Sequence, residues 1–415
     1  MLKKLRLERF KNFESSELTL GSFNVLVGTN AAGKSNLREA FRFLHGIARG
    51  YNLAEIIGEK WIEGGVIQWR GIRGGTREIA FHGASTFRLE VDFLTSKGED
   101  ATYKIEVNPG SNGEAPRVMA ESLYVAETSV FDESLSQLSH EERLNMILNN
   151  PNIISIKYNN DNDIYTDAPI FSQTIRGNFK PSYQEKAQEA IAAFRSMRFL
   201  DLSPEAMRLP SLPGQTTLGD RGENLSSVLQ AICQNPQRRE TLRQWLAELT
   251  PMDAVDFEFP ADFTGKILLT LVEKNGQKTS AYSASDGTLR FLAIIAALLG
   301  PEPAKFYFFE ELENGIHPTR LHLLLQLIET QVNRQNIQIV ATTHSSQLLG
   351  LLSDQSLESA SLIYRLEHHH DAKIIRILDI PEAKNIIKEQ HLSRLHASAW
   401  LEDVMEFTAD DEVAE

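Results

Sequence analysis

The segment at residues 28–35 constrains the fold of this chain more than any other part of the sequence. It is Gly-Thr-Asn-Ala-Ala-Gly-Lys-Ser and follows the apolar run Phe23–Val27, as expected for a loop between a buried strand and a helix. The two glycines allow backbone N–H groups to close around phosphate oxygens, and the N-terminus of the following helix adds partial positive charge. In this pattern Lys34 reaches the β- and γ-phosphates, and the Ser35 hydroxyl ligates Mg²⁺. The segment therefore predicts a site for a nucleoside triphosphate.

Length, cysteine content and the N-terminus limit the class of protein. The chain has 415 residues, 42% of them hydrophobic, which is enough for two or three globular domains. Cys233 is the only cysteine, which rules out an intrachain disulfide and favours a reducing compartment. Residues 1–7 alternate leucine with charged residues and lack the apolar core of a signal peptide. No apolar run approaches the roughly 18 residues of a membrane span, so we expect a cytoplasmic protein with no membrane partner.

The net charge of −14 is unevenly distributed. Residues 401–415 hold seven acidic residues and no lysine or arginine, so this tail accounts for half of the excess. The tail is either a solvated terminus or a docking segment for a basic partner. The overall charge argues against a basic surface over the whole protein. Local basic faces near residues 3–11 or 70–77 leave DNA open as a partner.

The first two thirds of the chain change from one hydrophobic period to another. After a predicted helix at 35–49 and a Gly-rich connection at 64–75, alternation indicates half-buried antiparallel strands. These strands are expected at 78–81, 86–93, 102–107 and 117–126. The period then becomes helical and is broken repeatedly by proline. Candidate helices lie at 139–148, 183–199 and 223–249.

The last third returns to strands and then alternates strand with helix, which favours a parallel sheet. Strands are expected at 256–259, 266–272, 305–309 and 337–342, helices at 288–299, 318–332 and 346–352, and a hairpin at 361–366 with 373–378. The predicted fold class is α/β, with a mixed sheet, an antiparallel β-subdomain and a mainly helical insertion. Its expected parts are an N-terminal lobe at 1–126, the insertion at 127–251, a C-terminal lobe at 252–380, and a helix with the acidic tail at 381–415.

Polar residues follow two of these predicted strands. Glu310 and Glu311 come directly after the apolar strand Phe306–Phe309, and α/β sheets bind ligands at the carboxyl ends of their strands. With a phosphate loop present, Glu310 is suited to hold Mg²⁺ and Glu311 to polarise an attacking water. Two acids after a strand also occur in capped turns. His344 follows the strand at 337–342, where a lone histidine commonly satisfies strand-end groups instead.

Residues 283–288 are Ser-Ala-Ser-Asp-Gly-Thr and open the helix that precedes the acidic pair, which by itself fits a Ser/Asp helix cap. This loop resembles the signature loop of ABC-type ATPases, in the variant found in relatives of RecF, SMC proteins and the OLD family. The signature lies 25 residues before Glu310, and His344, which resembles the switch histidine of the same superfamily, lies 34 residues after it. Phe10-Lys11-Asn12-Phe13 resembles the first strand of that branch.

The resemblance implies an ABC-type P-loop ATPase head that acts as a homodimer, or within a higher oligomer, around ATP and Mg²⁺. The signature loop of one copy closes on the nucleotide held by the other, and residues 313–318 resemble the loop that contacts the second subunit. Position 310 is Glu where the superfamily usually has Asp, and Gln68 is a candidate for the glutamine loop. The implied catalytic residues are Lys34, Glu311 and His344, the nucleotide-binding residues are Asn30, Gly33, Lys34, Ser35, Asn36, Ser285 and Gly287, and the metal ligands are Ser35 and Glu310.

The implied activity is ATP hydrolysis that opens and closes the dimer, in DNA repair, DNA-end processing or anti-phage defence, with a separately encoded effector. We expect no intrinsic nuclease, because about 37 residues follow position 378, too few for the TOPRIM domain that OLD relatives usually append. Two other classes remain open. One is the nucleotide-binding subunit of a membrane transporter, although the phosphate loop and the signature lie 250 residues apart, farther than in such subunits. The other is a binding module that does not hydrolyse ATP.

Overall fold

The computed structural model divides into two compact units, and each is considered by itself. The first comprises Met1–Met197, Glu358–Ala383 and Trp400–Glu415, and the second comprises Arg198–Leu357 and Lys384–Ala399. The structure describes residues 1–110, 113–133, 168, 169, 171, 181–249, 254–366, 369–390, 392–397, 400 and 403–405. The predicted parts divide the chain at other positions, and that division stays a prediction.

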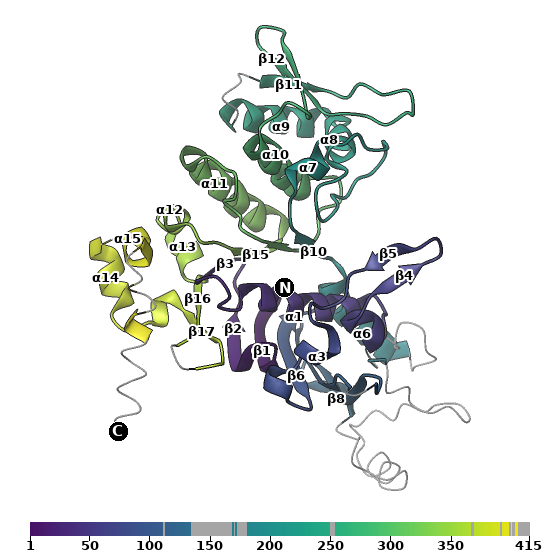
Figure 1. Cartoon of the computed structure of the whole chain (residues 1–415), viewed down its shortest axis with the longest axis vertical. Coiled ribbons are helices and arrows are strands. Elements are labelled where there is room, and N and C mark those ends of the chain that lie inside the picture. The colour runs from purple at the N-terminus through teal and green to yellow at the C-terminus, as the bar shows by residue number, and fades with distance from the viewer. Residues whose placement is uncertain are drawn as a thin grey trace. The chain divides into compact units, whose positions relative to one another are not determined.

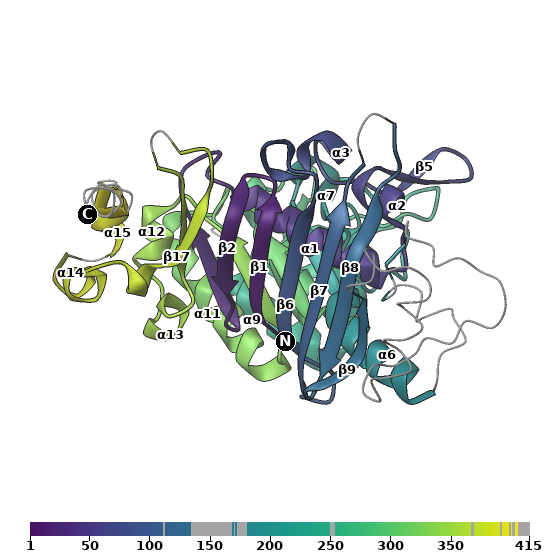
Figure 2. The ribbon, with the colours of Figure 1, turned by 90° about the horizontal axis from the view of Figure 1, so that it is seen from below.

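Among its described residues, the first unit contains a six-stranded antiparallel sheet in the order β2-β1-β6-β7-β8-β9, and Figure 2 shows these strands side by side. The strands are β1 (Leu2–Phe10), β2 (Phe13–Thr19), β6 (Phe87–Leu94), β7 (Asp100–Asn108), β8 (Arg117–Val125) and β9 (Thr128–Glu133). Phe87 and Leu89 are buried on one face of β6, whereas Arg88 and Glu90 on the other face pair with Glu106 at 2.9 Å and Arg6 at 2.5 Å. This alternation confirms the predicted antiparallel subdomain.

Two helices pack on the apolar face of this sheet. Phe43 of α1 (Lys34–Ala48) meets Phe87, with ring centroids 5.4 Å apart. Phe194 of α6 (Pro181–Arg195) meets Phe93 at 4.9 Å. Burial of side chains of this size stabilises a fold by about 1.5–3 kcal/mol each. The two helices therefore cover part of the apolar face of this sheet.

Strand β3 (Phe23–Val27) leads into α1, and all five of its residues are buried. It pairs in parallel with β16 (Ser361–Tyr364), and β16 pairs antiparallel with β17 (Lys373–Arg376). A strand covered on both faces reads as a continuous apolar run rather than an alternating one. The predicted hairpin near the end of the chain is thus confirmed, and it supplies the neighbour of β3.

The segment between α1 and β6 differs from its prediction in two ways. The Gly-rich connection contains α2 (Leu53–Ile57) and a hairpin of β4 (Lys60–Ile62) with β5 (Val66–Trp69), whose turn uses Gly64 and Gly65 at φ 88° and 72°. The predicted strand at 78–81 is wrong, because α3 (Gly75–Glu78) and the 3₁₀ turn η1 (Phe81–Gly83) occupy it. Strand β1 already pairs with β2 and β6, so only a single bridge, Phe10 to Ala80, forms there.

The second unit holds the strand and helix alternation expected of the last third. Strands β14 (Phe306–Phe309) and β15 (Gln338–Thr342) are parallel and buried, and β10 (Met197–Leu200) is the next strand beyond β14. Helices α10 (Asp286–Leu299) and α11 (Pro318–Gln335) precede and follow β14. Apart from β10, which was not predicted, these elements match the predicted ones to within three residues. They place Glu310, Glu311 and His344 just after strand ends.

A helical group and a small sheet complete the second unit, and Figure 1 shows α7 to α10 gathered together. The helices are α7 (Pro204–Met207), α8 (Leu225–Cys233) and α9 (Pro236–Leu249), and the strands are β11 (Ala254–Glu258), β12 (Thr270–Glu273) and β13 (Lys278–Ser280). The predicted helix at 223–249 is broken before Pro236, and the one at 183–199 ends where β10 begins. Both breaks follow from residues that cannot continue a helix or that pair in a sheet. The predicted helix at 139–148 lies outside the described residues.

Short helices end the described chain. They are α12 (Ser346–Leu349), α13 (Asp354–Leu357), α14 (Ala383–Gln390) and α15 (Leu392–Ala397). Helix α12 packs against α15, where Gly350 closely approaches Ser393. In the part of the chain that the structure describes, we find no helix with the length and apolar character needed to cross a bilayer.

Candidate functional site

The phosphate loop lies between β3 and α1 in the first unit, and two glycines fix its shape. Gly28 and Gly33 have φ values of 149° and 131°, which side-chain-bearing residues rarely adopt. A Cβ on Gly28 would lie 2.1 Å from the Ile363 carbonyl oxygen of β16, and one on Gly33 would lie 2.9 Å from Phe13 Cζ. Any larger residue would push the loop away from its neighbours, so both glycines of the pattern are required sterically.

Lys34 is 7% exposed, and its ammonium group is held inside the loop. Nζ donates hydrogen bonds to the carbonyl oxygens of Gly28 at 2.6 Å and Thr29 at 2.9 Å. The first turn of α1 carries no acidic residue, and no described side chain caps it at Gly33. A helix N-terminus with a lysine beside it favours an anion. The geometry of residues 28–35 thus suits a phosphate group.

Asn12 supports this loop from the turn between β1 and β2. Its side-chain nitrogen donates to the Ala32 carbonyl at 3.0 Å, and its oxygen accepts from Asn36 Nδ2 at 2.7 Å. The Asn12 carbonyl also accepts from the Ala372 N–H at 2.7 Å. Asn36 was expected to contact nucleotide, and the structure shows that its side-chain amide faces Asn12. The sequence analysis singled out residues 10–13 because they resemble a family motif. It did not predict the hydrogen bonds of Asn12 to the phosphate loop.

The acidic pair occupies the loop after β14 in the second unit. Glu311 has φ 47°, an uncommon value for a residue with a side chain. Its N–H donates to Thr342 Oγ1 at 2.9 Å, and its carboxylate oxygen Oε2 accepts from Asn314 Nδ2 at 3.2 Å. Glu311 is exposed, whereas Glu310 is half-buried, and the Glu310 N–H donates to the Leu200 carbonyl of β10 at 3.3 Å. Glu311 is therefore an oriented carboxylate that solvent or a ligand can reach.

His344 lies in the loop after β15 and is tied to the acidic loop. Its N–H donates to Glu313 Oε1 at 2.9 Å, and the Leu312 N–H donates to the Thr342 carbonyl at 3.1 Å. Ser345 then caps α12 by accepting from the Leu348 N–H at 3.2 Å. The histidine is thus held at the same end of the two parallel strands as Glu310 and Glu311.

Ser285 caps α10, and Gly287 lies in its first turn. Ser285 Oγ accepts from the Thr288 N–H at 3.2 Å, while Arg208 holds Asp286 at 2.6 Å and the Ala284 carbonyl at 3.0 Å. A Cβ on Gly287 would lie 2.2 Å from the Gly315 carbonyl oxygen. The signature loop therefore rests on the backbone of the loop that follows the acidic pair, which is one structural reason for glycine at 287.

The predicted residues fall into two groups. Asn30, Gly33, Lys34, Ser35 and Asn36 belong to the first unit, and Ser285, Gly287, Glu310, Glu311 and His344 belong to the second. Within the second unit, the loop at 310–317 touches both the start of α10 and the His344 loop. Gln68 is an exposed residue of β5. The roles assigned to these residues remain predictions.

A preformed metal cage is absent among the described residues, since no three His, Cys, Asp or Glu side chains gather closely enough to hold an ion. Mg²⁺ in phosphate-transfer sites commonly keeps several waters and takes only one or two protein ligands besides the substrate phosphates. A hydroxyl from Ser35 and a carboxylate from Glu310 are oxygen donors of the kind that it prefers. Each of these oxygens is thus chemically suited to Mg²⁺.

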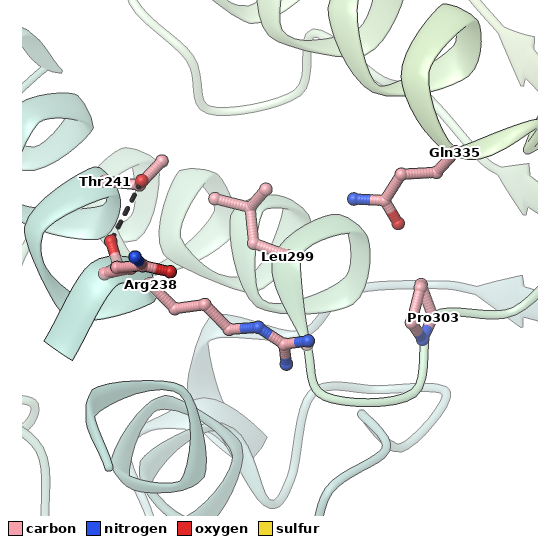
Figure 3. Close-up of a pocket in the computed structure, with 7 residues that line it drawn as sticks. Arg238, Thr241, Leu299, Pro303 and Gln335 are labelled. Carbon is pink, nitrogen blue, oxygen red and sulfur yellow. Dashed lines mark hydrogen bonds between the residues drawn. The ribbon is translucent and has the colours of Figure 1, made fainter. Parts of the chain in front are cut away.

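A pocket of about 250 Å³ in the second unit lies at the opposite end of α10 from Ser285. Figure 3 shows the polar Arg238 and Thr241 of α9, the apolar Leu299 at the end of α10 and the polar Gln335 at the end of α11. Its lining is Gln237, Arg238, Thr241, Leu299, Gly300, Pro303 and Gln335. Since a helix rises 1.5 Å per residue, the length of α10 separates this pocket from the signature loop by roughly 20 Å. None of the predicted site residues lines it.

Comparison with known proteins relates this geometry to a family. A family model described as "AAA domain, putative AbiEii toxin, Type IV TA system" matches residues 23–350, which include the phosphate loop, the acidic pair and His344. A Helicobacter pylori protein named "ATP/GTP phosphatase" is 25% identical over 362 residues, covering 85% of this chain and 87% of that protein.

Solved structures of SMC head domains also align with the chain at low similarity. One, "Crystal structure of the SmcHead bound to the C-winged helix domain of ScpA", covers 90% of this chain and 96% of its own, with 12% identity and a TM-score of 0.48. The "SMC head domain from Thermotoga maritima" covers 91% and 98%, with 12% identity and a TM-score of 0.43.

Proposed function

The chain belongs to the AAA-domain family whose model matches residues 23–350. From that premise we propose that it is an ATP-hydrolysing enzyme and that ATP binding and hydrolysis switch it between a dimer and separate copies. Membership confirms the prediction of a P-loop ATPase head made from the motifs. The observation that carries the proposal is the exposed Glu311 carboxylate, oriented by Asn314 and placed at the end of β14. A carboxylate in this position is suited to polarise an attacking water.

The proposed reaction assigns each predicted site residue a role toward ATP. Lys34 and the N–H groups around Asn30, Gly33 and Ser35 bind the phosphates, and His344 contacts the γ-phosphate. Ser35 and Glu310 are the residues that would hold Mg²⁺, which when bound would neutralise charge on the phosphate oxygens. Glu311 orients the water and accepts its proton. Phosphoryl transfer depends mainly on positioning and charge stabilisation, and the hydrogen bonds that hold Glu311 and His344 supply that positioning.

The proposed dimer uses the signature loop of a second copy. Ser285 and Asp286 are exposed at the N-terminus of α10, so they are available to another molecule. Ser285 and the first N–H groups of that helix offer donors and a partial positive charge to a γ-phosphate. ATP would therefore join two heads, and loss of the γ-phosphate would release them.

Replacement of Glu311 tests the proposal. Glu311→Gln should lower ATP turnover by about 100-fold or more, because a general base and its charge are removed, while ATP affinity stays within about twofold of wild type. Light scattering with ATP should then show a dimer that persists in the variant and dissociates in the wild type. The matched control is Glu302→Gln, an exposed glutamate in the turn before β14. Turnover in Glu311→Gln equal to that of the control would refute the assigned role.

For the biological setting, the family description favours defence over DNA-end processing. It names a putative toxin of a type IV TA system, and a toxin–antitoxin pair is one setting for a separately encoded partner. Turnover and dimer formation should be measured with that effector and with linear duplex DNA. If linear duplex DNA alone stimulated ATP turnover, a role in DNA-end processing would be favoured instead.

A further inference from the structure

Glu313 lies in the loop for which the family resemblance predicts contact with a second subunit, yet its side chain turns inward. Its carboxylate oxygen Oε1 accepts a hydrogen bond from the N–H of His344 in the same unit, at 2.9 Å. The Ile316 N–H donates to the Glu313 carbonyl, also at 2.9 Å, and this turn fixes the backbone from which the side chain extends. The contact joins two residues that are 31 positions apart.

Three hydrogen bonds connect the acidic loop with the end of β15. Two of them end on Thr342: its hydroxyl accepts from the Glu311 N–H at 2.9 Å, and its carbonyl accepts from the Leu312 N–H at 3.1 Å. The third is the bond from His344 to Glu313. Thr342 is the last residue of a buried strand, so its two bonds anchor the loop to the sheet. The Glu313 bond extends this anchorage beyond the sheet to His344 itself.

The remaining oxygen of Glu313 has no partner that would explain the carboxylate as an ion pair. Oε2 is buried and makes no hydrogen bond to any described residue, and no lysine or arginine among those residues forms a salt bridge with Glu313. Its structural contribution is therefore as an acceptor for the His344 N–H. An amide oxygen could replace that acceptor, whereas an alanine could not.

We propose that Glu313 is a positioning residue for the ATP hydrolysis proposed above, and that it holds His344 in register with Glu311. The inference rests on that proposed function. Glu313 touches neither nucleotide nor water in this role. It acts through His344. Because the two residues are hydrogen-bonded, a movement of the acidic loop would also move His344, the residue proposed to contact the γ-phosphate. Hydrogen bonds to charged groups are strong enough to set such a geometry.

Three variants distinguish the role of Glu313 as a hydrogen-bond acceptor from the role of its negative charge. Glu313→Ala removes the acceptor, Glu313→Gln retains it without charge, and Glu302→Ala removes an exposed glutamate of the same unit as a matched control. We expect kcat to fall about 10- to 100-fold in Glu313→Ala, the range for loss of a hydrogen bond to a charged group. The KM for ATP should stay within about twofold. Glu313→Gln should recover kcat to within about threefold of wild type.

A double-mutant cycle with His344→Ala tests whether Glu313 acts through the histidine. If it does, Glu313→Ala should change kcat little once His344 is already alanine. Equal effects in both backgrounds would overturn the proposal. So would a glutamine variant as slow as the alanine variant, because that result assigns the charge itself to the chemistry.

Amide hydrogen exchange makes the test independent of catalysis. The peptide covering residues 340–348 should exchange faster in Glu313→Ala than in wild type or Glu313→Gln, with exchange elsewhere unchanged. A wild-type protein that binds but does not hydrolyse ATP would refute the proposed function, yet the exchange result would still report on the Glu313 contact. Unchanged exchange in Glu313→Ala would refute the positioning role, whether or not the protein is an ATPase.

Discussion

The phosphate loop of the first unit and the acidic loop of the second are shaped by different means. Around Lys34, glycines let the backbone approach its neighbours, and a Cβ at Gly28 would meet a main-chain oxygen at 2.1 Å. Around Glu311, side chains hold the backbone, because Thr342 and Glu313 accept from N–H groups of the facing loop. The phosphate loop depends on glycines that permit close approach of the backbone, whereas the acidic loop depends mainly on hydrogen bonds that its own and facing side chains accept.

The contrast suggests that the two loops contribute to different steps. A loop that wraps its own N–H groups around phosphates determines how tightly nucleotide is held. A loop that orients a carboxylate and a histidine determines how fast the bound nucleotide reacts. We therefore expect substitutions in or beside the phosphate loop to change the Kd for ATP, and substitutions in or beside the acidic loop to change kcat. The variants below test this separation, beginning with the largest expected effect.

Lys34→Ala should weaken ATP binding by about 100-fold or more, since it removes the charged donor that would exchange its two loop carbonyls for phosphate oxygens. Titration with a fluorescent ATP analogue measures the Kd. Lys97→Ala, which removes a surface lysine of the same unit, is the control. If Lys34→Ala bound ATP as tightly as wild type, the claim that the phosphate loop determines ATP affinity would be refuted.

Thr342→Val should lower kcat about 10-fold and leave the Kd for ATP unchanged. The valine keeps the volume of a buried side chain but leaves the Glu311 N–H without its acceptor, a loss of about 1–1.5 kcal/mol. Steady-state turnover and ATP titration give the two values. Thr241→Val, in α9 of the same unit, should change neither. If Thr342→Val raised the Kd instead, the assignment of binding and reaction to separate loops would fail.

Asn12→Ala should raise the Kd for ATP about fivefold with kcat nearly constant. It removes two hydrogen bonds that support the phosphate loop from outside, to Ala32 and from Asn36, and the net value of such a bond is about 1 kcal/mol. The same titration measures the change. A fall in kcat at unchanged Kd would show that Asn12 belongs functionally with the second group.

Cys233 should have the smallest effect because it lies at the end of α8 and belongs to neither loop. Burial raises the pKa of its thiol to about 11, so the thiol stays protonated as pH rises toward that value. At pH 8 only about one molecule in a thousand carries the reactive thiolate. We expect slow alkylation by iodoacetamide at pH 8, and Cys233→Ser with Kd and kcat within about twofold of wild type. Rapid alkylation of the folded protein would contradict this environment.

The positions of the motifs in the fold were easier to predict from the sequence than the hydrogen bonds that support them. Lys34 was identifiable because consecutive residues carry its pattern. The contacts of Asn12 with Ala32 and of Glu311 with Thr342 join residues 20 and 31 positions apart, and hydrogen bonds of that kind leave no periodic signal. Thr342 in particular looks like any β-branched residue at the end of a strand.

Similar reasons explain which elements were predicted. Helix α10 and strand β14 are almost entirely buried, so their apolar runs were unmistakable. The hairpin of β4 and β5 was missed because its side chains near the turn are exposed, including Trp61 at 54% and Val66 at 57%. Without a buried face there is no alternation to detect, and the glycines between them suggested only a connection.

The pairing of β3 with β16 has a consequence for synthesis of the protein. The strand that leads into the phosphate loop finds this neighbour about 330 residues later in the chain. At ordinary elongation rates a ribosome needs roughly 20 to 70 s to cover that distance. Through that interval the nascent chain carries an apolar strand whose edge toward β16 is unpaired, the kind of surface that chaperones protect and that aggregation exploits.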